Sequence, residues 1–344
     1  MGLSIHYCDS FNPSVSLQEL KAKNHMNDVR HKNCHNHLNA LFIILVFLLI
    51  NISSGLSQVA PDQYRIFIIS DFQAPMLAEK IFSNPYRNEE ARDSLFADII
   101  LQRPKNLFLL GDMTSKGSKE KAWAPLDTFL NSLKKINTSV YAIPGNHEYM
   151  GKSAGMKMFK QRFDSQCLYG YFVTVDSITI VMLNSNFKNL SERELSQQLT
   201  FYKSVMDSLD TDQSVKAIIV CTHHAPYSNS KVVGSSKPVE DLIVPTFEKS
   251  AKSKLFISGH SHNLEYFSDS IGKHFLVIGG GGGIAQSLFP VNKGKYHDLL
   301  IQDAKPLYFY LVIEKIGKYL KIIVKGFKKD FRFFESEIGI IPLK

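Results

Sequence analysis

Short apolar runs alternate with amphipathic segments along the chain from residue 64 onward. Residues 64–70 (YRIFIIS) and 107–110 (LFLL) are nearly continuous apolar runs, as expected for strands buried on both faces. Residues 89–102 and 191–209 instead place apolar side chains at helical spacing, and the second segment begins with Ser-Glu-Arg-Glu, a capping-box pattern. This alternation of strands and helices predicts an α/β fold.

The remaining segments continue the alternation and then change to hairpins. A helix that begins at residue 118 directs several large apolar side chains toward the core, and a third buried strand ends at Pro144. Further elements are a hairpin at 171–184, a strand at 216–221, a helix at 238–251, strands at 254–258 and 274–278, and a final hairpin around Gly317. Strand–helix pairs followed by hairpins predict a four-layer α/β/β/α sandwich, in which two mixed sheets are flanked by helices.

A different pattern precedes residue 59. Residues 40–50 form an apolar run, with Arg30 and Lys32 before it and small residues such as Ser53 and Gly55 after it. These are the parts of a secretory signal, and the run is shorter than the roughly 20 apolar residues that a membrane-spanning helix needs. We expect an N-terminal leader at 1–58 and one domain at 59–344, secreted or periplasmic. A signal anchor at 40–52, which leaves the domain outside the cytosol, is the alternative.

Composition indicates a globular chain with a basic excess. Of 344 residues, 44% are hydrophobic and 21% are charged, and the formal net charge is +8, which leaves ample material for a large core. Much of the positive excess lies near the chain ends, notably at Lys318, Lys321, Lys325, Lys328 and Lys329. Solvated strand faces explain these lysines as well as nucleic-acid binding does, so nucleic acid is the less favoured partner. The four cysteines are too scattered for a disulfide framework or a zinc ribbon.

Polar side chains follow five predicted strands at the point where each strand ends. Open α/β sheets build their sites at the carboxyl ends of strands. The five turns supply carboxylates, amides and imidazoles but no thiolate, a ligand set that suits Mn, Fe, Zn or Co. A shared Asp can hold two such ions roughly 3.5–4 Å apart. The candidate residues are Asp71, Gln73, Asp112, Asn146, His147, His223, His260 and His262.

The order of these turns resembles the calcineurin-like metallophosphoesterase superfamily. The ordered signature of that superfamily is D-x-H, GD, GNH[DE], a His-bearing turn and GHxH. The corresponding stretches here are Asp71-Phe72-Gln73, Gly111-Asp112, Gly145-Asn146-His147-Glu148, His223-His224 and Gly259-His260-Ser261-His262. The resemblance covers residues 64–327, and the GNHE form with a His-His-Ala-Pro-Tyr-Ser turn is most like the purple-acid-phosphatase-like branch. It implies the metallo-dependent phosphatase fold.

The resemblance also implies a dinuclear centre that hydrolyses phosphate esters. One divalent ion would be held by Asp71, Asp112 and His262. Asp112 would bridge to a second ion, which is completed by Asn146, His223 and His260. A hydroxide between the ions would attack phosphorus in line, and His147 would protonate the leaving group or hydrogen-bond the transition state. A small phosphate ester, either a monoester or a diester, is the expected substrate.

Three positions depart from the family pattern. Gln73 stands where the first motif usually has His, and it would either bind the first ion or hydrogen-bond a ligand. Ser115 stands where purple acid phosphatases have a ligating Tyr, so we expect no iron(III)–tyrosinate colour. The fourth turn offers two imidazoles, and its distance to the following Pro-Tyr-Ser favours His223 as the ligand. His224 would then support the ligands or face the substrate. The same role is expected for Glu148.

Two further functions stay open on the sequence. One is a catalytically silent module that uses the same fold to bind a partner, and the other is a nuclease helped by the basic charge. Retention of the whole ligand set apart from the first-motif His favours a hydrolase over the silent module. The glycines at 279–283 lack a following Gly-Lys-Ser/Thr and do not form a nucleotide P-loop. We expect them to let the backbone pass close to the site.

Overall fold

The computed structural model describes residues 4–6, 64–76, 79, 87–164, 166–300 and 305–343. Apart from residues 4–6, the predicted leader lies outside the described residues, and so does the apolar segment at 40–52. The secretory signal and the signal anchor therefore stay predictions. Within the described ranges, no helix is both long enough and apolar enough to cross a membrane.

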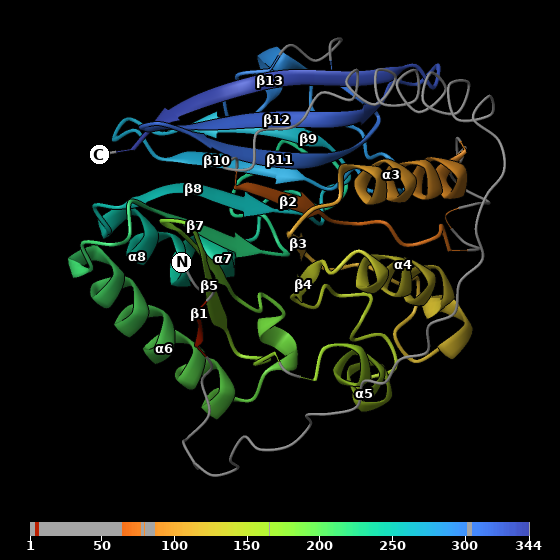
Figure 1. The fold of residues 1–344 in the computed structure, drawn as a ribbon, viewed down its shortest axis with the longest axis horizontal. Coiled ribbons are helices and arrows are strands. Elements are labelled where there is room, and N and C mark those ends of the chain that lie inside the picture. Colours follow the sequence, from red (N-terminus) through yellow and green to blue (C-terminus); the bar gives the residue numbers. More distant parts are fainter. Residues whose placement is uncertain are drawn as a thin grey trace, which may run out of the picture. The chain divides into compact units, whose positions relative to one another are not determined.

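Two mixed sheets form the centre of the fold (Figure 1). The seven-stranded sheet has the order β1 (Ser4–His6), β5 (Tyr171–Val175), β6 (Ile178–Met182), β7 (Ala217–Thr222), β8 (Ser253–Ser258), β10 (His274–Ile278) and β9 (Leu264–Ser268). The six-stranded sheet has the order β13 (Phe333–Pro342), β12 (Tyr319–Phe327), β11 (Tyr308–Ile316), β2 (Arg65–Ile69), β3 (Asn106–Leu109) and β4 (Ser139–Ala142). The parallel strands of each sheet, β6–β7–β8–β10 and β2–β3–β4, lie beside antiparallel neighbours.

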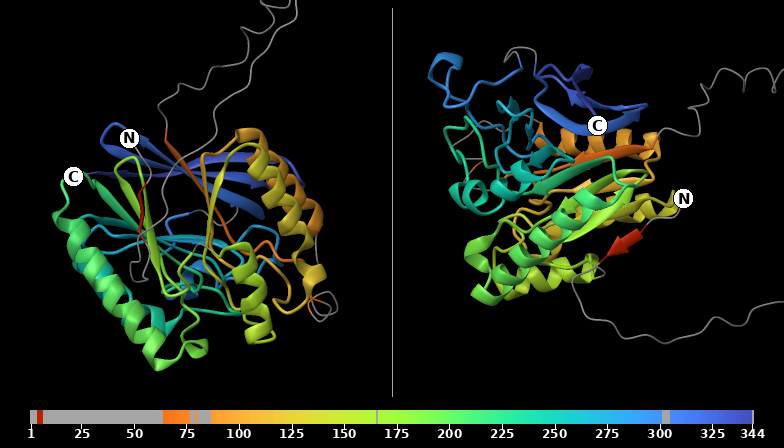
Figure 2. Two further views of the ribbon diagram at one scale, coloured as in Figure 1. Left: turned by 60° about the horizontal axis from the view of Figure 1, so that its bottom comes forward. Right: turned by 90° about the vertical axis from the view of Figure 1, so that its left-hand side faces the viewer.

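Helices cover the outer face of each sheet (Figure 2). The six-stranded sheet packs against α3 (Asn88–Gln102), α4 (Ala124–Lys135) and α5 (Ser153–Arg162). The seven-stranded sheet packs against α6 (Glu192–Thr211), α7 (Lys237–Leu242) and α8 (Val244–Lys249). Within the part of the chain that the structure describes, there are also three short 3-10 helices: η2 (Glu120–Trp123), η3 (Phe187–Asn189) and η4 (Val291–Lys293). The predicted four-layer α/β/β/α sandwich is confirmed.

The period of two along each strand produces three apolar layers. In β2, Ile66 and Ile68 enter the layer between the sheets, whereas Phe67 and Ile69 face the helices. In β7, Ile219 and its alternate neighbours likewise face the other sheet, and Ile218 and Val220 pack against α6 and α8. Because both faces of these strands are buried, the runs are apolar throughout, which is why the sequence predicted them well.

One helix start agrees with the sequence prediction, whereas several other elements differ from it. The capping box at Ser191 is present, because Glu194 N–H donates to the Ser191 hydroxyl and the Glu194 carboxylate accepts from Ser191 N–H. The single helix expected at 238–251 is instead two helices, α7 and α8. Pro245 lies in the first turn of α8, where its missing N–H is tolerated, but it cannot continue a preceding helix. Strands β9 and β13 and helix α5 were not predicted.

Candidate metal centre

Five polar turns lie at the carboxyl ends of β2, β3, β4, β7 and β8, and folding brings them together. Two groups of three side chains each are found among the described residues. Within each group, the possible ligand atoms all lie within 4.8 Å of one another. The carboxylate-rich group consists of Asp71, Asp112 and His262, and the imidazole group consists of His223, His224 and His260. Three parallel strands of one sheet and two of the other thus point their carboxyl ends at one place, as expected for a site in this class of fold.

The turns hold three of these residues in an uncommon backbone conformation. The φ angles are 58° at Asp71, 49° at Asp112 and 65° at His260, all in the left-handed region. Such a conformation costs about 1–3 kcal/mol for a non-glycine residue and persists where the surrounding structure imposes it. Here it turns each side chain toward the others directly after its strand, so the strain is part of how the site is built.

Two glycines allow the backbone to pass close to the ligands. A Cβ atom at Gly145 would lie 2.2 Å from Asp112 Oδ1, and one at Gly283 would lie 2.6 Å from the His262 ring. The Gly283 N–H also donates to the Asp71 carbonyl at 2.7 Å. The glycine run at 279–283 therefore passes against the site, as predicted.

In the carboxylate-rich group, a carboxylate oxygen and an imidazole nitrogen present lone pairs that suit a cation. Asp71 Oδ1 lies 3.4 Å from His262 Nε2, and the His262 Nδ1–H donates to the Ile284 carbonyl at 2.7 Å. Donation from Nδ1 leaves Nε2 with a free lone pair in the neutral ring. The Asp71 carboxylate is itself fixed by the backbone N–H of His260, at 2.9 and 3.1 Å.

Gln73 lies beside this group and is buried. Its amide nitrogen is 3.3 Å from His262 Nε2, and its amide oxygen is buried without a hydrogen-bond partner among the described residues. A buried acceptor without a partner costs about 1–3 kcal/mol. Turning the amide over would exchange its nitrogen and oxygen and bring the oxygen beside His262 Nε2, where a divalent cation would satisfy it, so the residues present fit a metal here.

Asp112 belongs to the carboxylate-rich group and also lies next to His223 of the imidazole group. Its Oδ2 atom is 3.4 Å from His223 Nε2, and His223 Nε2 is 3.1 Å from Asn146 Oδ1. The His223 Nδ1–H donates to the Leu110 carbonyl at 2.8 Å, so in the neutral ring Nε2 again presents a lone pair. Three acceptor atoms that converge in this way fit a second cation, with Asp112 in the position of a shared ligand.

The charge states of these groups agree with that geometry. Burial raises the pKa of Asp112, but the imidazoles of His223 and His147 outweigh burial and hold it well below its ordinary value. Burial lowers the pKa of His223, yet Asp112 outweighs burial and raises it to about 9. Burial, together with His223, lowers the pKa of His260 to about 4, which keeps that ring neutral. The centre therefore combines a carboxylate of lowered pKa with one imidazole of raised pKa, His223, and one of lowered pKa, His260.

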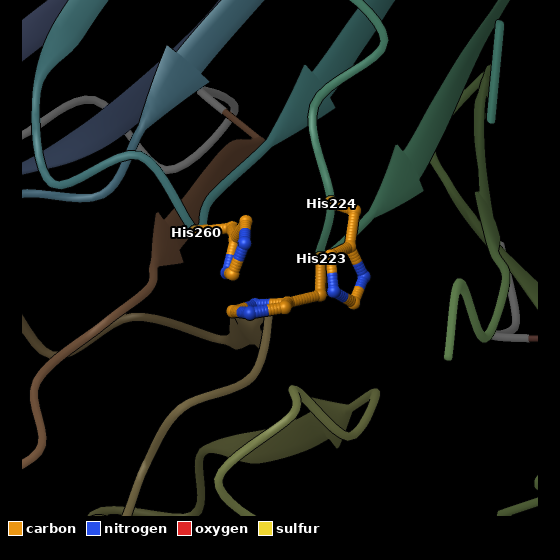
Figure 3. Close-up of side chains that lie close together, drawn as sticks. All are labelled: His223, His224 and His260. Atoms are coloured by element: carbon orange, nitrogen blue, oxygen red, sulfur yellow. The ribbon is translucent and has the colours of Figure 1, made fainter. Parts of the chain in front are cut away.

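His147 and His224 lie at the edge of the ligand groups. The His147 Nδ1–H donates to the Ser115 carbonyl at 2.9 Å, which directs Nε2 toward Asp112 Oδ2, 3.8 Å away. The ring of His224 lies 4.4 Å from that of His260 and 4.9 Å from that of His223, measured between centroids (Figure 3). Both imidazoles are close enough to the ligands to touch a molecule bound there.

Glu148 does not face the pocket. Its side chain is completely buried, and its carboxylate accepts backbone N–H groups from the second and third turns. The donors are Asp112 at 2.8 Å, Met113 at 2.8 Å, Thr114 at 3.3 Å and Gly145 at 2.7 Å. Burial, together with Asp112, raises the pKa of Glu148 to about 7. Glu148 therefore supports the ligands from behind and is not available to a substrate.

Glu265 is a second buried carboxylate that holds a loop of the site, here the one that follows β7. It was not identified from the sequence. It accepts the Ser228 hydroxyl and the Asn229 N–H, each at 2.7 Å, and it lies three residues after His262. It is completely buried within β9, whose sequence is LEYFS. A single carboxylate inside an apolar strand was the signal that could have identified it.

A cavity of 410 Å³ opens beside the imidazole group. Asn146, His224 and His260 line it together with residues 185–189, residues 233–236 and Pro238. Lys188 is the one residue with a formal charge among those that line it, and no carboxylate is among them. The cavity is therefore suited to a small anionic molecule with some apolar surface.

Comparisons with known proteins agree with this geometry. The family described as Calcineurin-like phosphoesterase matches residues 64–264, more than half of the chain. Purple acid phosphatase 4 of Arabidopsis thaliana is 27% identical in an alignment of 159 residues that covers 41% of this chain and 46% of that protein. The chain thus aligns with less than half the length of this relative.

Solved structures share the fold. A purple acid phosphatase from yellow lupin (Lupinus luteus) seeds has a TM-score of 0.60 at 16% identity, over 80% of this chain and 53% of that one. GAP50, described as the anchor in the inner membrane complex of Plasmodium, has a TM-score of 0.57 at 16% identity, over 82% and 89%. A dimetal phosphatase from Danio rerio has a TM-score of 0.52 at 15% identity, over 82% and 99%. From the family match and the buried His/Asp groups, the chain is a member of the calcineurin-like phosphoesterase family.

Proposed function

We propose that the protein hydrolyses small phosphate esters, either monoesters or diesters, at a dinuclear metal centre. The observation that supports this most directly is the position of Asp112, which adjoins both the Asp71–His262 pair and His223. A shared carboxylate of this kind suits two divalent ions, for which Mn, Fe and Zn are the candidates. One ion would be held by Asp71, Asp112, His262 and Gln73, and the other by Asp112, Asn146, His223 and His260.

Two bound cations would neutralise phosphoryl oxygens and lower the pKa of a bound water molecule. The protein itself would place the proton that the leaving group needs. Because the Nδ1–H of His147 is held by the Ser115 carbonyl, Nε2 carries a proton only when the ring is an imidazolium. That Nε2 atom lies 3.8 Å from Asp112 Oδ2, on the side of the ligand groups. His147 is therefore positioned to deliver a proton from Nε2 to the leaving oxygen.

Replacement of His147 by Gln tests this role. We expect kcat on an alkyl phosphate to fall by about 10²–10⁴-fold, the usual contribution of a positioned general acid. The loss should be smaller on p-nitrophenyl phosphate, because p-nitrophenolate leaves without a proton. Steady-state kinetics on both esters measure the difference, and His297→Gln, an exposed histidine, is the matched control. Equal losses on the two esters would contradict proton donation.

Replacement of Gln73 by Ala tests the first ion. We expect the affinity for that ion to fall at least about tenfold, since loss of a supporting polar group alone weakens metal binding by about 10–100-fold. Competition with a chelator, followed by elemental analysis, measures the affinity of each site. Gln197→Ala on the exposed face of α6 is the control. Unchanged affinity in Gln73→Ala would show that the amide oxygen does not bind the ion.

The proposed activity is tested by hydrolysis of p-nitrophenyl phosphate and bis(p-nitrophenyl) phosphate with added Mn²⁺ or Zn²⁺. Wild-type protein that binds two ions but hydrolyses neither ester would favour the alternative of a silent binding module. GAP50 shows that this fold also occurs in a protein described as an anchor, so the fold alone does not decide between the two. The ligand set and His147 are what favour hydrolysis.

Nuclease activity is less well supported. In the six-stranded sheet, Lys321 and Lys325 lie 3.4 and 3.1 Å from Glu337 and Glu335 on the neighbouring strand. These glutamates partly neutralise the basic cluster near the C-terminus, which weakens its attraction for a phosphate backbone. Metal-dependent cleavage of single-stranded DNA, with a strong dependence on salt, would restore the nuclease hypothesis.

A further inference from the structure

Ser185 and His224 both line the 410 Å³ cavity, and two hydrogen bonds join them. The His224 backbone N–H donates to the Ser185 hydroxyl at 2.9 Å, and the same hydroxyl lies 2.9 Å from His224 Nδ1. Ser185 is 5% exposed. The serine therefore meets both the main chain and the ring of the same histidine.

The number of protons fixes the direction of the second bond. The backbone N–H can only donate, so Oγ of Ser185 is the acceptor in the first bond. The hydroxyl has one proton, and among the described residues its remaining contact is His224 Nδ1. If Nδ1 carried the proton of that contact, the buried hydroxyl would lack an acceptor, at a cost of about 1–3 kcal/mol. The favoured arrangement has the Ser185 O–H donating to Nδ1, so the neutral ring carries its proton on Nε2.

This tautomer is the reverse of the one at two other imidazoles of the site. Nδ1 of His223 and Nδ1 of His262 face the carbonyls of Leu110 and Ile284, which only accept. Those rings keep Nε2 free to bind a cation. The His224 ring, with Nδ1 occupied by a donor, presents an N–H at Nε2 and cannot bind a cation through that atom. The hydrogen-bond partners thus give a physical basis for the difference between two adjacent histidines, of which the sequence favoured His223 as the ligand.

The orientation of the ring places that N–H at the site. Figure 3 shows one ring nitrogen of His224 facing the rings of His223 and His260 and the other turned away from them. Since Nδ1 contacts Ser185, the nitrogen that faces the other imidazoles is Nε2. His224 also lines the cavity together with Asn146 and His260, so a phosphoryl group at the ligands would lie within its reach.

We propose that His224 is a substrate-binding residue, which donates its Nε2–H to an oxygen of the phosphoryl group, and that Ser185 is the positioning residue that fixes this tautomer. The proposal rests on the proposed function only in taking a phosphate group as the ligand. It excludes His224 from both metal sites, although its ring is close enough to His260 to be grouped with the ligands.

Nitrogen NMR of protein labelled at histidine, loaded with Zn²⁺, tests the tautomer directly. We expect an unprotonated Nδ1 and a protonated Nε2 at His224 in the wild type. Ser185→Ala should lose this preference, and Ser185→Thr should keep it because the hydroxyl remains. A proton on Nδ1, or a zinc-bound Nε2, in the wild type would overturn the proposal whatever the variants do.

Metal content and binding of inorganic phosphate test the role. In His224→Phe we expect wild-type zinc stoichiometry and a phosphate dissociation constant raised about 10–100-fold, the effect of losing a hydrogen bond to a charged group. In Ser185→Ala the constant should rise about two- to tenfold, with Ser208→Ala, an exposed serine of α6, as the control. Loss of one zinc equivalent in His224→Phe would overturn the proposal. Wild-type protein that shows the expected tautomer and phosphate binding but no hydrolysis would refute the proposed function alone.

Discussion

Replacing Asp112 by Ala is expected to lower kcat/KM for p-nitrophenyl phosphate by at least about 10³-fold, more than the loss of a single stabilising hydrogen-bond donor. Asp112 is the carboxylate that adjoins both ligand groups, with Oδ2 3.4 Å from His223 Nε2. Its other oxygen accepts the His147 backbone N–H at 2.9 Å. One substitution therefore weakens both metal sites and also releases the turn that carries the proposed proton donor.

Elemental analysis and kinetics on the same preparation measure this prediction. We expect both metal equivalents to be held less tightly in Asp112→Ala, whereas Gln73→Ala should affect only one. Asp207→Ala, an exposed carboxylate on α6, is the control for general effects of losing a charge. A variant that keeps both ions at wild-type affinity would contradict the shared position of Asp112, and with it the dinuclear centre.

Replacing Glu148 by Ala is expected to lower the free energy of unfolding by several kcal/mol, because each buried donor left without an acceptor costs about 1–3 kcal/mol and the turns can relax in part. Four backbone N–H groups would lose their acceptor in a place that water does not reach, because Glu148 is completely buried. The turns after β3 and β4 would then relax, and the ligands Asp112 and Asn146 would shift with them.

Urea unfolding of the metal-free protein measures the stability change without a contribution from bound ions. Glu148→Gln should lose less than Glu148→Ala, because the amide keeps one acceptor oxygen. Glu192→Ala, at an exposed position in the first turn of α6, is the control. If Glu148→Ala unfolds at the same urea concentration as the wild type, the backbone N–H groups have other acceptors and Glu148 is not the support of these turns.

The sequence predicted well those elements that depend only on the residues within them. Strand β2 is buried on both faces, so its apolar run needed no knowledge of its neighbours. The start of α6 depends on contacts within four residues, and the capping box at Ser191 is present. Strand β13 was missed because it is an edge strand in which exposed and half-buried residues alternate, and because the polar segment at 335–337 interrupts its apolar residues.

In the candidate site, too, the sequence predicted what is local and missed what depends on residues far apart in the chain. The motifs placed Asp71, Asp112 and His260 at strand ends, since turn residues follow apolar runs directly in the sequence. They did not show that Glu148 lies behind the ligands, or that Glu265 holds the loop after β7. Those functions depend on backbone N–H groups and hydroxyls up to 37 positions away in the chain, as with Ser228 and Glu265.

The sequence by itself determined which kinds of side chain end the strands, and therefore that oxygen and nitrogen ligands for divalent ions were available. Tertiary structure decided which atom of each side chain faces the centre. The fourth turn illustrates the reason: His223 meets the carbonyl of Leu110, which follows β3 of the other sheet, and His224 meets the hydroxyl of Ser185, which follows the neighbouring strand β6. A carbonyl and a hydroxyl impose opposite tautomers on two adjacent imidazoles, and these partners come together only when the two sheets pack against each other and β6 pairs with β7.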